Sequence, residues 1–163
     1  EELGIQIFSF PMKYSPISET DRTYIGKNWC KKYIRAISAI LQVTKGVVAA
    51  GSNFFYKAFG NSLDEYFELL AMPRELIMFR SYFEKNGTTQ KWLTLYRELS
   101  DEQKENLLRL VSLNVSELKR IPWPDDLKSI LEFYLIKYSD EVKNSKKDYV
   151  QLSFLDDDLN DED

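Results

Sequence analysis

The sequence contains no histidine and a single cysteine, Cys30, among its 163 residues. Without histidine, the chain cannot supply a Ser–His or Cys–His nucleophile pair, a histidine general base or a histidine metal ligand. One cysteine excludes an internal disulfide, which is typical of proteins from a reducing cytoplasm. An iron–sulfur cluster needs three or four thiolates, so this chain alone cannot hold one. We therefore expect a cytoplasmic protein.

Long apolar runs are also missing. None approaches the roughly 20 residues of a membrane span, and no signal-peptide pattern is visible. The hydrophobic content of 44% is sufficient for one domain with a core. The net charge of -4 is unevenly spread, because residues 1–60 hold eight Lys and Arg against four Asp and Glu, whereas six of the last eight residues are acidic. We expect no membrane association.

The first twenty residues read as the end of another domain. Glu1–Gly4 is typical of the last turn of a helix, and Ile5–Phe10 has the composition of a β-strand. No second strand is evident downstream, and one strand cannot satisfy its own backbone donors and acceptors. We therefore expect residues 1–20 to be the end of a truncated α/β domain, a partial TIM-like barrel, from a longer protein.

The remaining sequence predicts a mainly α fold. Residues 21–143 form the expected helical C-terminal domain, and residues 144–163 an acidic tail that we expect to be largely disordered. The apolar segments of the expected helices run from Ile25 to Leu41, Phe54 to Phe59, Leu63 to Leu70, Leu76 to Phe83, Trp92 to Leu99, Leu107 to Val111 and Leu127 to Leu135.

Local signals predict where these helices begin and end. Ser62 with Glu65, and Ser100 with Gln103, have the capping-box spacing in which two side chains and two backbone N–H groups bond reciprocally. Pro73 fits a first helical turn, where its missing N–H costs nothing. Gly60 and the pair Asn86-Gly87 are typical of helix ends, and Pro122-Trp-Pro124 predicts a rigid break.

A basic stripe is the first candidate binding feature. Lys27, Lys31 and Arg35 are successive i,i+4 neighbours on the long helix expected from Ile25 to Leu41. They can be interpreted as a phosphate-binding stripe, but a solvated face opposite a buried one is the commoner situation. The acidic composition argues against nucleic acid, and we favour the solvated face. Arg22, which can pair with Asp21, is a further candidate for a substrate or partner contact.

Cys30 and two carboxylate pairs also have two interpretations each. Cys30 can be a nucleophile activated by nearby lysines, but a buried, unreactive thiol is more common. The pairs Asp64–Glu68 and Asp101–Glu105 could serve metal binding or acid–base chemistry. They also complement helix dipoles in first turns, which we favour.

Lys13 and Tyr14 lie three and four residues after Phe10, the end of the expected strand. In α/β folds ligands bind at the carboxyl ends of strands, so these two residues are candidates for contacting a cofactor or substrate. A structural role for this loop is an equal alternative.

Several segments together resemble the C-terminal portion of a group of radical S-adenosylmethionine (radical SAM) proteins. They are Ile7-Phe-Ser-Phe-Pro-Met-Lys-Tyr14, Ser15-Pro-Ile17, Asp21-Arg22, Gly26-Lys-Asn-Trp29, Tyr33-Ile-Arg-Ala-Ile37, Thr44-Lys-Gly-Val-Val48, Phe54-Phe-x-x-Ala-Phe-Gly60 and Met72-Pro-Arg-Glu75. The resemblance covers roughly residues 1–100. In such proteins a Cys-x3-Cys-x2-Cys motif near the first strand of a partial barrel holds a 4Fe-4S cluster, and Cys30 matches none of its positions.

The resemblance implies that this chain is a non-catalytic fragment of a radical SAM iron–sulfur enzyme. Its helical domain would cover the upstream α/β domain or recruit a substrate or partner, and the cluster and S-adenosylmethionine would bind upstream. The alternative is a non-enzymatic cytosolic interaction module, in which the acidic tail with Phe154 acts as a docking peptide. The substrate stays open in both cases.

Overall fold

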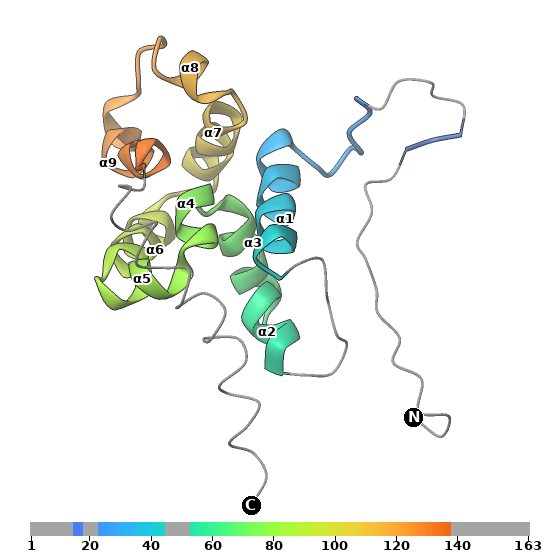
Figure 1. Ribbon diagram of the computed structural model, residues 1–163. Coiled ribbons are helices and arrows are strands. Elements are labelled where there is room, and N and C mark those ends of the chain that lie inside the picture. The colour runs from blue at the N-terminus through green and yellow to red at the C-terminus, as the bar shows by residue number, and fades with distance from the viewer. Residues whose placement is uncertain (1–14, 18–22, 45–52, 138–163) are drawn as a thin grey trace, which may run out of the picture.

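A computed structural model describes residues 15–17, 23–44 and 53–137 of the chain. All regular secondary structure in these residues is helical, which confirms the mainly α prediction (Figure 1). The expected strand Ile5–Phe10 and the tail 144–163 lie outside the described residues. The elements are α1 (Lys31–Val43), α2 (Asn53–Phe59), α3 (Leu63–Ala71), α4 (Arg74–Met78), α5 (Arg80–Lys85), α6 (Thr88–Glu98), α7 (Asp101–Val111), α8 (Val115–Leu118), η1 (Asp125–Leu127), α9 (Lys128–Leu131) and η2 (Glu132–Leu135).

Helix α1 begins six residues later than the apolar pattern predicted. Cys30 is its N-cap, with an extended backbone at φ -127° and ψ 165°, and Trp29 N donates to Gly26 O in a preceding turn. Gly26 and Asn28 both favour turns over helix, so the sequence before Cys30 leaves the helical path. Ile25 and Lys27 are therefore not helical, and the prediction of one helix from Ile25 to Leu41 was wrong at its start.

Of the two predicted capping boxes, one forms completely and the other in part. Ser100 Oγ accepts from Gln103 N at 3.2 Å while Gln103 Oε1 accepts from Ser100 N at 2.9 Å, the predicted capping box of α7. At α3, Ser62 Oγ accepts from Glu65 N as predicted, but Glu65 reaches back to Asn61 N instead of Ser62 N, at 2.7 Å. The Asn61 backbone N–H is the main reason why the pKa of Glu65 is lowered.

Two helix boundaries differ from the predictions. The segment expected as one helix from Pro73 to Phe83 is divided at Phe79, whose φ of -127° and ψ of 45° lie outside the helical range and redirect the chain between α4 and α5. After the break at Pro122–Pro124, the last expected helix is a series of short turns, η1, α9 and η2. Helix α8 was not predicted, although Asn114 and Glu117 form a capping box there.

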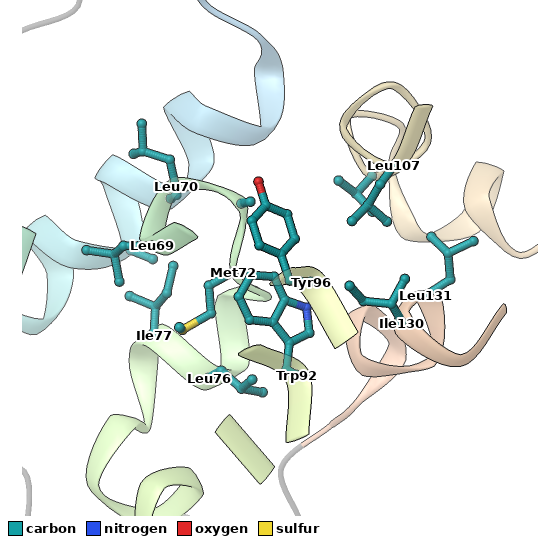
Figure 2. Close-up of a cluster of buried hydrophobic side chains, with 14 of the residues drawn as sticks. Leu69, Leu70, Met72, Leu76, Ile77, Trp92, Tyr96, Leu107, Ile130 and Leu131 are labelled. Carbon is teal, nitrogen blue, oxygen red and sulfur yellow. The ribbon is translucent and has the colours of Figure 1, made fainter. Parts of the chain in front are cut away.

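The core lies where α6 meets the other helices. Trp92 and Tyr96 of α6 stack with ring centroids 4.9 Å apart and an interplanar angle of 16°. In Figure 2 these two rings lie between side chains of α3 and α4 on one side and of α7 and α9 on the other. Burial raises the pKa of Tyr96 strongly. The core therefore holds the early and late helices together as one packed unit.

In the described part of the chain, no helix has both the length and the apolar character that crossing a bilayer requires.

Candidate functional site

A cleft of about 570 Å³ separates the N-terminal end of α1 from α7. We call it the α1–α7 cleft. One wall comes from the turn before α1 and its first residues: Lys27, Asn28, Trp29, Cys30 and Tyr33. The other wall comes from α7 and the residue after it: Glu102, Glu105, Asn106, Leu108, Arg109 and Ser112. Positions 102, 105, 109 and 112 recur at helical spacing, which explains why they share one face of α7.

The cleft combines an apolar wall with charges of both signs. Trp29 is 44% exposed, and its ring meets that of Tyr33 edge-on at a centroid distance of 6.5 Å. Arg109 Nη2 donates to Asn106 Oδ1 at 2.8 Å. Burial, and then the nearby Cys30, raise the pKa of Tyr33. The cleft therefore suits the binding of an apolar group flanked by charge.

A row of aromatic rings leads away from the cleft over α1, α3 and α2. Successive centroid distances are 6.5 Å from Trp29 to Tyr33, 6.1 Å to Phe67, 6.0 Å to Tyr66 and 6.3 Å to Phe59. The row begins at an exposed ring and ends at the buried Phe59, so the hydrophobic core here extends to the surface. Beyond the cleft, Phe67 is the exposed ring of this row. We call Phe67, together with the exposed Leu63 of α3 and Tyr56 of α2, the aromatic face.

Lys32, in the first turn of α1, is only 4% exposed. Its Nζ donates to Leu70 O at 3.0 Å and to Met72 O at 2.6 Å, at the C-terminus of α3. The last carbonyls of a helix lack intrahelical partners and carry the negative end of its dipole, so a cation is stabilised there. Burial lowers the pKa of Lys32 to about 7, opposed by Cys30 and reinforced by Arg35.

Arg35 likewise donates to the last carbonyls of a helix, in this case α7. Its guanidinium donates to Leu113 O at 2.8 Å, to Ser112 O at 2.9 Å and to Val111 O at 3.4 Å, around the C-terminus of α7. The predicted basic stripe is therefore corrected. Lys27 precedes α1, so the three residues do not form one helical stripe. Lys31 and Arg35 are both exposed on α1, and Arg35 also donates to backbone carbonyls of the α7 end.

In the described residues, the members of the pairs Asp64–Glu68 and Asp101–Glu105 have separate surroundings and form no shared site. Glu68 accepts two bonds from Arg97, at 2.6 and 2.8 Å, which link α3 to α6. Asp64 and Asp101 lie in first turns as expected, and Glu105 lines the α1–α7 cleft.

Cys30 is half-buried in the α1–α7 cleft. Its thiol is therefore neither fully buried, as an unreactive cysteine would be, nor fully exposed, as a nucleophile would be. Lys13, Tyr14, Arg22 and Phe154 lie outside the described residues.

The residues present do not fit the iron–sulfur cluster that the radical SAM resemblance implies. The sequence offers only the Cys30 thiolate, and the described residues contain no group of three or more His, Cys, Asp or Glu side chains placed to hold a metal ion. Any cluster would need ligands from outside this chain.

Comparison with protein-family models, with curated proteins and with solved structures found no match to this chain. The radical SAM relationship therefore stays a prediction from the sequence.

Proposed function

We propose that this chain is the helical C-terminal part of a radical SAM iron–sulfur protein, and that its helices cover the upstream α/β domain without themselves being catalytic. The radical SAM part of this proposal rests on the sequence resemblance, and the observation that carries the covering role is the aromatic face. Leu63 is 68% exposed, Tyr56 49% and Phe67 42%, and the Phe67 ring continues outward from the buried Phe59 by way of Tyr66. Large apolar side chains left exposed in this way are typical of a contact with another domain or protein.

The position of the aromatic face favours the upstream domain as its occupant. The row starts at Trp29, only nineteen residues after Phe10, the end of the expected strand. A fully extended segment of that length spans at most about 65 Å. An α/β domain that ends at Phe10 is therefore tethered close to the aromatic face, which raises its local concentration there.

In the parent protein, cluster-bound S-adenosylmethionine would supply radical chemistry upstream of Glu1. The residues of this chain would contribute apolar contact area, and Lys13 and Tyr14 at the end of the expected strand are the candidates for approaching a bound ligand. The helical domain would shape access to that ligand from the side.

The experiment has two steps. The sequence encoded upstream of Glu1 should contain Cys-x3-Cys-x2-Cys, and the full-length protein, reconstituted anaerobically with iron and sulfide, should absorb broadly near about 400 nm. A full-length Cys30→Ser variant is the matched control and should absorb equally, because its thiol is not a ligand. A full-length protein without the motif, or without this absorption, would refute the proposal.

The α1–α7 cleft favours a second candidate function, a non-enzymatic interaction module that binds partners through this cleft. An apolar wall with charges of both signs suits a peptide with an apolar anchor. The upstream sequence separates the two candidates, since the module requires no cluster motif.

A further inference from the structure

The C-terminal residues of this chain pair apolar side chains with acids. Leu152, Phe154 and Leu155 are followed at once by Asp156, Asp157 and Asp158. We infer that residues 152–158, which lie beyond the described residues, bind in the α1–α7 cleft of their own chain. This inference does not depend on the upstream domain or on radical chemistry.

The end of the described chain and the start of α1 both contact the C-terminus of α3. Tyr134 Oη donates to Ala71 O at 2.6 Å, while Lys32 holds the neighbouring carbonyls of Leu70 and Met72. The final turn η2 and the start of α1 therefore meet at the same helix terminus. Lys32 is two residues from Cys30 in the cleft, and Tyr134 is three residues from Lys137, the last described residue.

The connecting segment is long enough. Residues 138–151 number fourteen and can span up to about 46 Å when extended. A short tether also gives the tail an effective concentration in the millimolar range at the cleft, so even weak contacts are occupied. Binding within one chain is therefore favoured over binding to a second copy at ordinary protein concentrations.

The apolar wall of the cleft matches the apolar half of the segment. Trp29 and Tyr33 present their rings on one side, and Leu108 lies on the other. Because Trp29 is only partly covered by the described residues, burying Phe154 or Leu155 against it removes apolar surface from water on both sides.

The charges of the cleft set the direction of the bound segment. Arg109 lies on α7 about 6 Å beyond Glu105 and about 10 Å beyond Glu102, from the helical rise. The three aspartates after Leu155 are attracted to Arg109 and Lys27 and repelled by the two glutamates. We therefore expect Asp156–Asp158 at the Arg109 end of the cleft.

A spin label in the tail tests this inference on the full 163-residue chain. In the Cys30→Ser/Ser153→Cys variant the label occupies position 153 alone, and serine is a favourable N-cap for α1. The chain has three tryptophans, whose indole N–H signals can be followed separately. We expect the label to broaden the Trp29 signal and to leave that of Trp123, in the loop beyond α8, sharp.

Charge reversal provides the matched control. Lys27→Glu with Arg109→Glu should abolish the broadening of Trp29, and adding Asp156→Lys, Asp157→Lys and Asp158→Lys should restore it. The milder pair Lys27→Gln with Arg109→Gln should give a partial loss and serves if the reversed variant does not fold.

Three results would overturn the inference. The first is a Trp29 signal no broader than that of Trp123. The second is broadening that the charge-reversed and neutralised variants leave unchanged. The third is broadening of an unlabelled, isotope-enriched chain when it is mixed with spin-labelled chain, because that result assigns the cleft to a second copy.

Discussion

The side-chain nitrogen of Lys32 donates a 2.6 Å hydrogen bond to the carbonyl oxygen of Met72, inside the core and forty residues away along the chain. The same kind of contact recurs at other helix ends. Arg35 binds the carbonyls that end α7, Arg80 binds Lys57 O in the last turn of α2, and Trp123 Nε1 donates to Leu118 O at 2.8 Å. Side chains from elsewhere in the chain thus satisfy the carbonyls that these short helices leave unpaired.

Replacing Lys32 tests this role. Lys32→Met keeps most of the volume but leaves Leu70 O and Met72 O without their buried donor, which should lower the free energy of unfolding by about 2 kcal/mol at neutral pH. Urea denaturation followed by circular dichroism measures the change. Lys31→Met, at an exposed position on the same helix, is the control and should alter stability little. A Lys32→Met protein as stable as the wild type would contradict the role.

The lowered pKa of Lys32 predicts a pH dependence of stability. The folded-state pKa is about 7 and the ordinary value 10.5, so between these values the unfolded chain binds the proton and the folded chain does not. Stability should therefore rise with pH in this window, by at most about 1.4 kcal/mol per pH unit. The carbonyls of Leu70 and Met72 favour the charged form and reduce the slope.

Two tyrosines, Tyr96 and Tyr134, should end the rise of stability with pH. Burial raises the pKa values of Tyr96 and Tyr134, so their stabilising contribution is complete below about pH 10 and is lost above it. Urea midpoints measured from pH 6 to 11 should pass through a maximum. Lys32→Met should flatten the rising part and keep the falling part, and an unchanged rise in this variant would assign the effect to other groups.

Arg35 should stabilise the end of α7 more than it stabilises the protein as a whole. Arg35→Met removes the donors to Ser112 O and Leu113 O, and we expect a loss of about 1 kcal/mol because the site is exposed. Amide hydrogen exchange should accelerate in the last turn of α7 and in α8. Arg35→Lys keeps the charge without the planar fork and should lie in between. Exchange unchanged in both variants would argue against this anchor.

Two glycines provide a matched comparison. Gly60 and Gly87 both have positive φ, 86° and 78°, which costs an alanine about 1 kcal/mol. A Cβ on Gly87 meets nothing within 4 Å, whereas one on Gly60 would lie 2.8 Å from Glu65 Cβ at the start of α3. Gly60→Ala should therefore destabilise the protein clearly more than Gly87→Ala in urea denaturation. Equal losses of unfolding free energy in the two variants would contradict this prediction, because they would show that the start of α3 shifts to accommodate the Cβ without destabilising the protein.

Local sequence signals predicted several helix ends correctly. The Ser100–Gln103 box and the ends at Gly60 and Gly87 were predictable, because each depends on residues within four positions of each other. The buried face of α1 was not. The pattern favoured its large apolar residues, but the most buried positions include Ala36, Ala39 and Lys32. Small residues let α1 approach α3 and α4 closely, and hydrophobic periodicity gives them little weight.

The candidate site was less predictable than the fold. Lys27, Cys30 and Glu105 were singled out from the sequence, but separately. The cleft joins the first two to Glu105 and Arg109 of α7, which lie more than seventy residues away. The role of Lys32 depends equally on Leu70 and Met72. Contacts over such separations follow from tertiary packing, which a single sequence does not reveal.

The most direct test of the central claim measures the aromatic face in two proteins. Hydroxyl-radical footprinting should be performed on the 163-residue chain and on the full-length protein that contains the upstream domain. We predict that oxidation of Leu63, Phe67 and Tyr56 falls severalfold in the full-length protein, while Tyr82 on α5 and Val115 on α8, which are also exposed, react equally in both. Equal oxidation of the aromatic face in the two proteins would contradict the claim that it covers the upstream domain.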